Sequence, residues 1–445
     1  ILVHPSRIED IRHELPNAGK NNLKNALDAL IADGRVMKNK KNRFAVSAHY
    51  GCAAGTYLAT ERAFAFVAPD YPEGEAKPDD LFIPPNASGG AWHGDRVLVK
   101  VSERKNNRGR KEATVIRVLG RAGKELTGEL VQRGKAFFVQ PTSKKYPEIA
   151  VDKHDLGEAA VGDCVAVSIS HYGDEQFMPQ GVVRVDLGES GTMEAAIAAV
   201  LHENGVYDVF PNEVLEQALA IPQEVDMGTA GKRLDLRDKL IFTIDGDDAK
   251  DFDDAVSLEK LENGHYLLGV HIADVSHYVT PDSPLDAEAF RRGTSVYFPG
   301  HVVPMLPFAL SNGICSLNQG VDRLALSCMM DINEKGEIVK HKICESVINV
   351  TRRMSYTSVH KIIEEKDEAE RKEYEELIPM FELMYELADI LQARREKRGA
   401  IDFDFPETKI ILDAQGRPVE IKPYERNVAT KIIEDFMLLA NETVA

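Results

Sequence analysis

The sequence predicts a multidomain α+β protein, in which a winged-helix-like segment precedes two small β-barrels and a larger mixed α/β domain. Three observations carry this prediction. The 445 residues exceed what one hydrophobic core usually supports, a set of short alternating strands repeats itself, and a dense acidic cluster lies near the start of the C-terminal part. We expect boundaries that divide the chain into 1–49, 50–120, 121–190, 191–232 and 233–445.

The first 46 residues have the pattern of two helices followed by a basic hairpin. Leucine and isoleucine recur at helical spacing in 21–32, after a first helical pattern in 6–15. Gly34 is expected to stop the second helix, and 35–46 alternates like a hairpin rich in Lys and Arg. This order is typical of a winged helix. Such modules serve both nucleic-acid binding and protein packing, and both alternatives stay open.

An internal repeat organises residues 55–188. Segment 58–69 matches 130–141, and 94–101 matches 162–169. Each copy offers short strands with Gly and Pro turns, which predicts a five-stranded OB-fold barrel. A basic excess in 96–124 lies within the first copy, and the second copy has no such run.

Both predicted barrels carry an aromatic strand. These strands resemble those of cold-shock domains, which stack bases on aromatic rings over a basic groove. The alternative is an ordinary core side chain, the commoner role of Phe on a strand. The candidates for RNA binding are Phe64, Phe66 and Phe137, with Phe138 beside them.

Composition restricts the class of protein. A net charge of −18 speaks against general nucleic-acid affinity, so any such binding must use local basic surfaces. The five cysteines are an odd number without a CxxC pair, which argues against a disulfide framework and a structural zinc site. No apolar run approaches the roughly 20 residues of a membrane span. We expect a cytoplasmic monomer that does not bind membranes, in a chain cut at both ends.

Six aspartates lie between Asp245 and Asp254, flanked by the apolar runs 240–244 and 255–258. Two carboxylates about 4 Å apart repel by roughly 4 kcal/mol at an effective dielectric near 20, so the cluster needs cations or solvent. An EF-hand loop fails on spacing, because its fifth and sixth positions would be Ala249 and Lys250. A solvated acidic turn and a structural Mg²⁺ remain as alternatives. The residue types fit a two-metal phosphodiester hydrolase using Mg²⁺, with Mn²⁺ as a substitute.

Several motifs resemble the catalytic domain of the ribonuclease II family, also called RNB exoribonucleases. The resemblance covers 233–445, and the repeat before it matches the paired cold-shock domains of that family. The motifs are Thr243-Ile-Asp245, Asp251-Phe-Asp253-Asp254, His271-Ile-Ala-Asp-Val-Ser-His277, Tyr297-Phe-Pro-Gly300, Pro304-Met-Leu-Pro307 and Leu310-Ser-Asn-Gly-Ile-Cys-Ser-Leu317.

The resemblance implies a Mg²⁺-dependent, processive 3′-to-5′ exoribonuclease. Its substrates would be single-stranded RNA and structured RNA with a 3′ overhang, and its products nucleoside 5′-monophosphates. One alternative is the branch of the family that stops at duplexes. Another is a non-catalytic RNA-binding or chaperone module.

The family pattern also assigns site residues. Those that hold Mg²⁺ and carry hydrolysis would be Asp245, Asp251, Asp253 and Asp254, whereas Asp247 and Asp248 match no ligand. The RNA-binding residues would be Tyr297 against bases, Phe403 near the 3′ end and Glu434 at the terminal nucleotides.

The C-terminus departs from the family pattern. The family continues with an arginine-bearing loop that clamps the reacting phosphate and with an S1-type barrel, and neither lies within these 445 residues. Losing an arginine clamp removes charge stabilisation from the transition state. We therefore expect this chain alone to bind RNA and to cut it poorly or not at all.

Two further patterns concern the core of the large domain. A helix over 374–395 would bury a stripe that includes Phe381, Met384 and Tyr385. His271 and His277 are expected to be hydrogen-bonded core residues and not metal ligands, because His favours softer metals than Mg²⁺.

Overall fold

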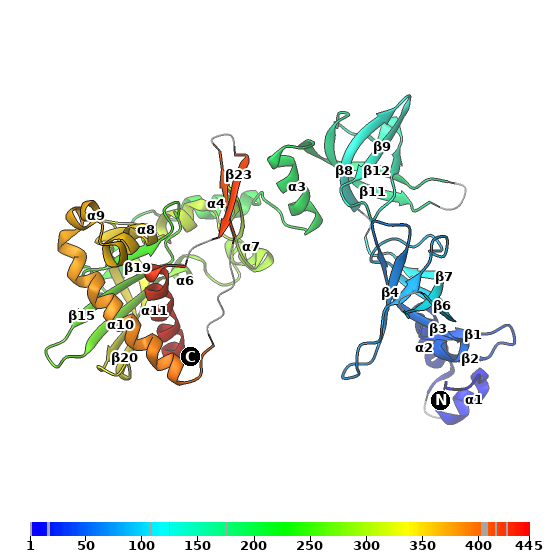
Figure 1. Ribbon diagram of the computed structural model, residues 1–445, viewed down its shortest axis with the longest axis horizontal. Helices are drawn as coiled ribbons and strands as arrows, with labels where there is room; N and C mark the ends of the chain where they lie inside the picture. Colours follow the sequence, from blue (N-terminus) through cyan, green and yellow to red (C-terminus); the bar gives the residue numbers. More distant parts are fainter. Residues whose placement is uncertain are drawn as a thin grey trace. The chain divides into compact units, whose positions relative to one another are not determined.

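The computed structural model describes residues 2–15, 18–106, 109–123, 125–173, 177–401, 408–413, 416–423 and 426–445 (Figure 1). The chain divides into two compact units, Ile1–Val206 and Tyr207–Ala445. The predicted multidomain α+β class is confirmed. Within the described residues no helix has the length and apolarity needed to cross a membrane, and all five cysteines are free.

The first unit begins with the two expected helices and hairpin. Helices α1 (Ile8–Glu14) and α2 (Lys20–Ala32) precede strands β1 (Val36–Lys38) and β2 (Phe44–Val46), which pair antiparallel. Gly34 has φ +76°, a conformation that favours glycine, and it ends α2 as predicted. Ile11, Leu23 and Phe44 contribute to a small shared core.

Two closed barrels follow. The first has the order β3-β4-β5-β7-β6 and the second β10-β12-β11-β8-β9. The strands of the first are β3 (Cys52–Ala59), β4 (Ala65–Pro69), β5 (Leu81–Ile83), β6 (Arg96–Lys105) and β7 (Lys111–Gly120). Those of the second are β8 (Glu125–Arg133), β9 (Ala136–Pro141), β10 (Ile149–Val151), β11 (Asp163–His171) and β12 (Gln180–Glu189).

One glycine in each barrel shows that the repeat is structural. Gly55 pairs with Pro69, and Gly128 pairs with Pro141. A Cβ atom at Gly55 would lie 2.2 Å from the Ala68 carbonyl oxygen, and one at Gly128 would lie 2.3 Å from that of Gln140. Both copies therefore require glycine at the same close approach of two strands. Helix α3 (Met193–Glu203) packs on the second barrel through Ala195 and Ala199.

The second unit is built on a seven-stranded sheet with the order β13-β20-β19-β16-β15-β14-β21. Its strands are β13 (Leu234–Asp235), β14 (Phe242–Asp245), β15 (Asp254–Lys260), β16 (Tyr266–Ala273), β19 (Asp322–Ile332), β20 (Ile338–Asn349) and β21 (Arg352–Ser355). The pairing is antiparallel except at β13–β20 and β14–β21.

The remaining elements flank this sheet. Before β19 they are α4 (Asn212–Ala220), α5 (Met227–Ala230), α6 (Val275–Tyr278), α7 (Pro284–Arg292), β17 (Val296–Phe298), β18 (His301–Val303) and η3 (Ala309–Ile314). After β21 they are α8 (Tyr356–His360), η4 (Lys361–Glu365), α9 (Glu368–Glu373), η5 (Glu375–Leu377), α10 (Ile378–Lys397), β22 (Thr408–Leu412), β23 (Pro418–Pro423) and α11 (Val428–Val444).

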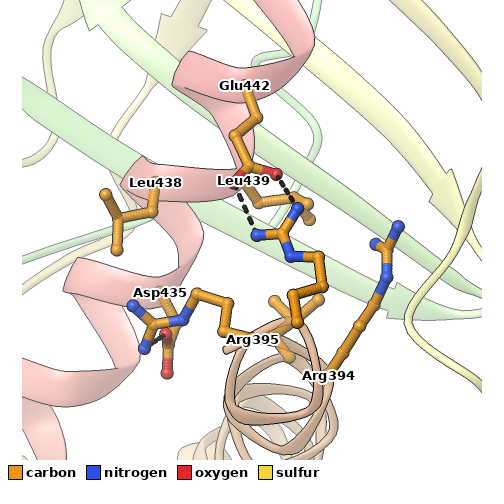
Figure 2. A pocket seen from close by; sticks show the side chains of 8 residues that line it. Arg394, Arg395, Asp435, Leu438, Leu439 and Glu442 are labelled. Atoms are coloured by element: carbon orange, nitrogen blue, oxygen red, sulfur yellow. Dashed lines mark hydrogen bonds and ion pairs between the residues drawn. The ribbon is translucent and has the colours of Figure 1, made fainter. Parts of the chain in front are cut away.

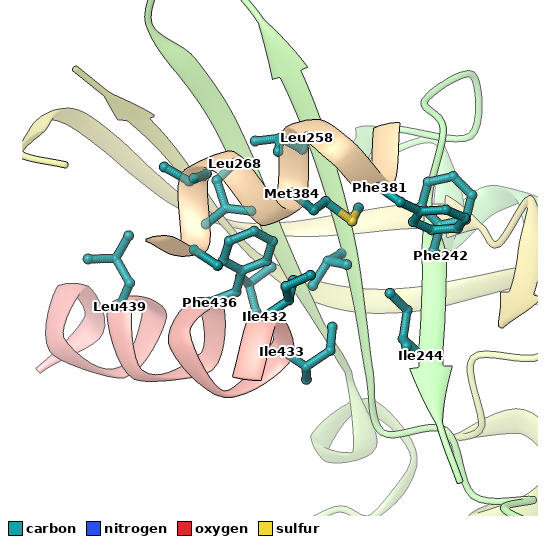
Figure 3. Close-up of a cluster of buried hydrophobic side chains, with 14 of the residues drawn as sticks. Phe242, Ile244, Leu258, Leu268, Phe381, Met384, Ile432, Ile433, Phe436 and Leu439 are labelled. Carbon is teal, nitrogen blue, oxygen red and sulfur yellow. The ribbon is translucent and has the colours of Figure 1, made fainter. Parts of the chain in front are cut away.

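Helices α10 and α11 cover one face of the sheet. Phe381 of α10 and Phe436 of α11 are fully buried among sheet residues such as Phe242 (Figure 3). The other face is covered partly by the segment between β14 and β15, which buries Phe252. This second layer places the acidic cluster directly on the sheet.

Three predictions about the core were wrong in detail. Helix α10 begins at Ile378, not at 374, because Pro379 occupies its first turn, where the missing N–H costs nothing. Tyr385 is 41% exposed, whereas Phe381 and Met384 are buried as expected. His271 is buried and hydrogen-bonded as predicted, but His277 is exposed, because it lies on the short helix α6 beyond the end of β16.

Candidate active site and RNA-facing surfaces

The acidic loop, residues 246–253, joins the end of β14 to the start of β15. Phe252 anchors it to the core, since its N–H donates to Ser316 Oγ at 3.0 Å and its carbonyl accepts from Leu317 N at 2.9 Å. The carbonyl of Asp253 accepts from Ala273 N at 2.9 Å. Phe252 is buried, Asp251 is half-buried and Asp253 is exposed, an alternation that favours the predicted placement of Asp251 and Asp253 on one side of the segment.

The structure brings the four predicted acids close enough to perturb one another. Partial burial, followed by the charges of Asp254, Asp253 and Asp251, raises the pKa of Asp245 to about 7, against the opposing influence of Arg353. Burial and the charge of Asp253 also raise the pKa of Asp254. Excess negative charge at the ends of two neighbouring strands is the electrostatic condition that a bound cation relieves.

Asp247 and Asp248 differ from these four in their contacts. Asp247 accepts a hydrogen bond from Thr357 Oγ1 at 2.8 Å, and hydrogen bonds from Ser355 and Thr357 lower its pKa. Asp248 is exposed. Asp247 is therefore occupied in holding the loop to the start of α8.

The chemistry of the acidic loop fits hard divalent cations, because its donors are carboxylate oxygens. Within the described part of the chain, however, no three His, Cys, Asp or Glu side chains are arranged to hold one metal ion. The four acids thus have the right donor type, and three of them influence the fourth electrostatically, but their side chains do not form a ligand set as they stand. Side-chain rotation would have to complete a ligand set.

Other predicted site residues lie on separate elements. Tyr297 of β17 is 64% exposed and reaches Asp251, and Glu434 of α11 forms an ion pair with Arg426. Phe403 lies outside the described residues.

The first barrel presents an aromatic cluster that sequence reasoning found only in part. Phe64, Phe66 and Phe82 are half-buried, with ring centroids 5.6 to 6.0 Å apart, and the Arg110 guanidinium lies 4.9 Å from the centroid of Phe66. Phe82 was missed, although its place between buried Leu81 and Ile83 on β5 is the alternation that identifies an outward-facing residue.

The two candidate aromatic residues of the second barrel have different surroundings. Phe137 packs partly against the barrel core, which favours the core interpretation for this residue. Phe138, its neighbour on β9, lies 5.6 Å beneath the Arg133 guanidinium. The outward ring is therefore Phe138.

A small cavity between α10 and α11 has a different character. Its volume of about 20 Å³ suits about one water molecule. Arg395 pairs with Asp435, and Arg398 pairs with Glu442 at 2.7 Å (Figure 2). Burial raises the pKa of Asp435 to about 6 despite its partner. These paired charges join two helices and leave the acidic loop as the candidate reactive centre.

Comparisons with known proteins agree with this architecture. Residues 55–118 match the Ribonuclease B OB domain, 138–211 the Cold shock domain and 233–445 the RNB domain. Ribonuclease R of Thermotoga maritima is 41% identical over 96% of this chain and 59% of its own length. Ribonuclease R 1 of Lactococcus lactis is 41% identical over 88% of the chain and 49% of its own length. The chain thus spans about half to three fifths of these relatives.

A solved structure gives the same result. The chain is similar to Mycoplasma genitalium RNase R in complex with ribose-methylated single-stranded RNA, with a TM-score of 0.75 and 28% identity. The match covers 88% of this chain and 61% of that one.

Proposed function

Because this chain belongs to the family that the RNB domain defines, we propose that it is the catalytic part of a 3′-to-5′ exoribonuclease of the ribonuclease R type. The observation that carries the proposal is that Asp245, Asp251, Asp253 and Asp254 lie at or between the ends of β14 and β15, where partial burial and then the charges of the other three acids raise the pKa of Asp245 to about 7. Scattered surface acids would not perturb one another in this way.

In this proposal the chain supplies a rigid frame for hydrolysis. Asp245, Asp251, Asp253 and Asp254 would hold Mg²⁺, with Mn²⁺ as a substitute, and the bound cations would neutralise phosphate charge and act as Lewis acids. Phe252 fixes the loop to the core, so the carboxylates are presented from a buried anchor. Tyr297 is 64% exposed and bonded to Asp251, and in this proposal it would contact a base next to the scissile phosphate.

The proposed substrate is single-stranded RNA or structured RNA with a 3′ overhang, degraded processively to nucleoside 5′-monophosphates. The aromatic cluster of the first barrel supports single-strand binding, because stacking on rings tolerates every base. A processive enzyme needs contacts of this kind in addition to those at its reactive centre. Monomeric state and cytoplasmic location stay predictions.

Hydrolysis of a 5′-labelled oligoribonucleotide by the complete protein with Mg²⁺ tests the proposal. We expect a ladder shortened from the 3′ end, release of 5′-monophosphates and little activity on DNA, which lacks 2′-hydroxyl groups. A 3′-overhang duplex should also be degraded; a stop at the duplex would indicate the other branch of the family. Binding without any cleavage would indicate a non-catalytic RNA-binding module.

A further inference from the structure

Arg353 makes more contacts with the acidic loop than any role assigned above explains. It lies on β21, which pairs in parallel with β14 so that Thr243 aligns with Arg353 and Asp245 with Ser355. Its Nη2 donates to the carbonyl oxygens of Asp247 at 2.9 Å and Ala249 at 3.0 Å. One guanidinium nitrogen therefore holds the loop backbone at two carbonyls, two residues apart.

The same guanidinium also contacts the buried anchor of the loop. Its central carbon lies 4.9 Å from the centroid of the Phe252 ring. A planar guanidinium can stack on a ring and donate in its own plane at the same time, whereas a lysine ammonium cannot. The backbone N–H of Arg353 donates to Gln319 Oε1 at 2.9 Å, so the strand that carries the side chain is itself fixed.

A second tether comes from the same segment. Thr357, at the start of α8, donates to Asp247 Oδ2 at 2.8 Å. Arg353 and Thr357 thus hold the loop through Asp247 and Ala249, and Ser316 and Leu317 hold it through Phe252. The loop held in this way carries the carboxylates of Asp251 and Asp253.

We propose that Arg353 is a positioning residue that fixes the backbone of the acidic loop before any cation binds, so that only the carboxylate side chains have to reorient. It acts through the carbonyls of Asp247 and Ala249 and through Phe252, and it touches neither the reacting phosphate nor the cation. Preorganisation of this kind lowers the cation concentration needed to fill the site, since less ordering remains to be done on binding. The inference rests on the proposed function, because it assumes that the four acids bind metal.

The chain offers a matched control in the preceding residue. Arg352 lies on the same strand, is exposed and pairs only loosely with Glu376 at 3.8 Å. Arg353→Met removes the hydrogen bonds to the loop, and Arg353→Lys keeps the charge but not the planar guanidinium. Arg352→Met removes a charge of the same sign from a side chain that does not contact the loop.

Calorimetric titration of each variant with Mn²⁺ alone is the first measurement. We expect Arg353→Met to raise the Mn²⁺ dissociation constant about tenfold, equivalent to about 1.4 kcal/mol. Arg353→Lys should raise it by roughly threefold, and Arg352→Met should leave it unchanged. Because Arg353→Lys keeps the charge and most of the volume, it carries the test even if Arg353→Met fails to fold.

Amide hydrogen exchange of the metal-free protein is the second measurement. Residues 247–251 should exchange faster in both Arg353 variants than in wild type or Arg352→Met, and excess Mn²⁺ should abolish the difference. Unchanged amide exchange of the loop in the Arg353 variants would overturn the proposal. An unchanged Mn²⁺ affinity together with a raised KM for RNA would also overturn it, because Arg353 would then be a substrate contact. If wild type binds no Mn²⁺, the proposed function fails, and the metal-free exchange data still decide whether Arg353 holds the loop.

Discussion

The Tyr297 phenol donates a hydrogen bond to Asp251 Oδ2 across 3.0 Å. Tyr297 lies on β17, within a two-stranded sheet separate from the strands that carry the acidic loop. The aromatic residue expected to contact bases is therefore tied to one of the acids expected to bind metal. In the proposed function, base binding and the orientation of Asp251 would be coupled through the Tyr297 side chain.

Tyr297→Phe separates these two roles. The ring stays, but Asp251 loses a donor that contributes about 0.5–1.5 kcal/mol, so we expect the single-turnover cleavage rate of the complete protein to fall about threefold to tenfold. RNA affinity should change by less than about twofold, because stacking uses the ring face. Tyr297→Ala should lower both. Wild-type kinetics in Tyr297→Phe would show that the hydrogen bond does not orient Asp251 for cleavage.

Asp253→Asn should abolish cleavage and keep RNA binding. A neutral amide is a weak ligand for a hard cation, and losing one electrostatic group at a reactive centre costs on the order of a hundredfold or more in rate. Asp248→Asn is the matched control, because Asp248 lies on the same loop, is exposed and matches no ligand position. Cleavage rates and filter-binding affinities measure the two effects. Equal rates in both variants would remove Asp253 from the mechanism.

A row of buried polar groups crosses the sheet beside the acidic loop. His271 on β16 lies 3.0 Å from Ser257 Oγ and 2.6 Å from Ser327 Oγ. Gly269 makes room for this row, since a Cβ there would lie 2.4 Å from Ser257 Oγ and 2.8 Å from His271 Nε2. Full burial lowers the pKa of His271 to about 4 from its usual 6.5.

This buried histidine predicts a specific dependence of stability on pH. In the unfolded chain His271 becomes protonated near pH 6.5, whereas in the folded protein it becomes protonated only near pH 4. The contribution of neutral His271 to the free energy of unfolding is therefore complete above pH 6.5. It is lost as pH falls toward 4, by about 3 kcal/mol over the whole window. Urea unfolding of the second unit, followed at several pH values, measures this effect. The free energy of unfolding should fall less steeply over this window in His271→Gln than in wild type. A parallel dependence in the two proteins would mean that His271 does not titrate in this way.

The two barrels permit a paired test of RNA stacking. Phe82→Ala should weaken single-stranded RNA binding by roughly tenfold, because stacking contributes about 1–3 kcal/mol per base. Phe137→Ala should leave RNA affinity unchanged and lower the stability of the second barrel, since that ring packs partly on the core. Fluorescence anisotropy and thermal unfolding distinguish these effects. If Phe137→Ala weakened RNA binding and Phe82→Ala did not, the RNA-binding surface would include Phe137 and not Phe82.

Most of the fold could be predicted because its signals are local and periodic. The alternation and the Gly–Pro turns of the repeat specify both barrels, and Gly34 marks the end of α2. The pairing of β21 beside β14 could not be predicted, because Arg352–Ser355 is separated from Phe242–Asp245 by about 100 residues and carries no motif of its own.

The candidate site shows the same division. The acids are recognisable by their density and spacing, but the partners that hold them come from distant segments. Nothing in the sequence near Asp251 points to Tyr297 as its hydrogen-bond donor, or near Asp247 to Arg353 and Thr357. Such contacts depend on tertiary packing, which periodicity does not encode.

The position of divalent cations tests the central claim most directly. Anomalous scattering from a Mn²⁺-soaked crystal of the complete protein should show density within coordinating distance, about 2.0–2.6 Å, of the carboxylates of Asp245, Asp251, Asp253 and Asp254. Two peaks about 4 Å apart are predicted if both cations bind without RNA. A saturated crystal with no peak at these carboxylates, or with Mn²⁺ bound only elsewhere, would contradict the assignment of the acidic loop as the reactive centre.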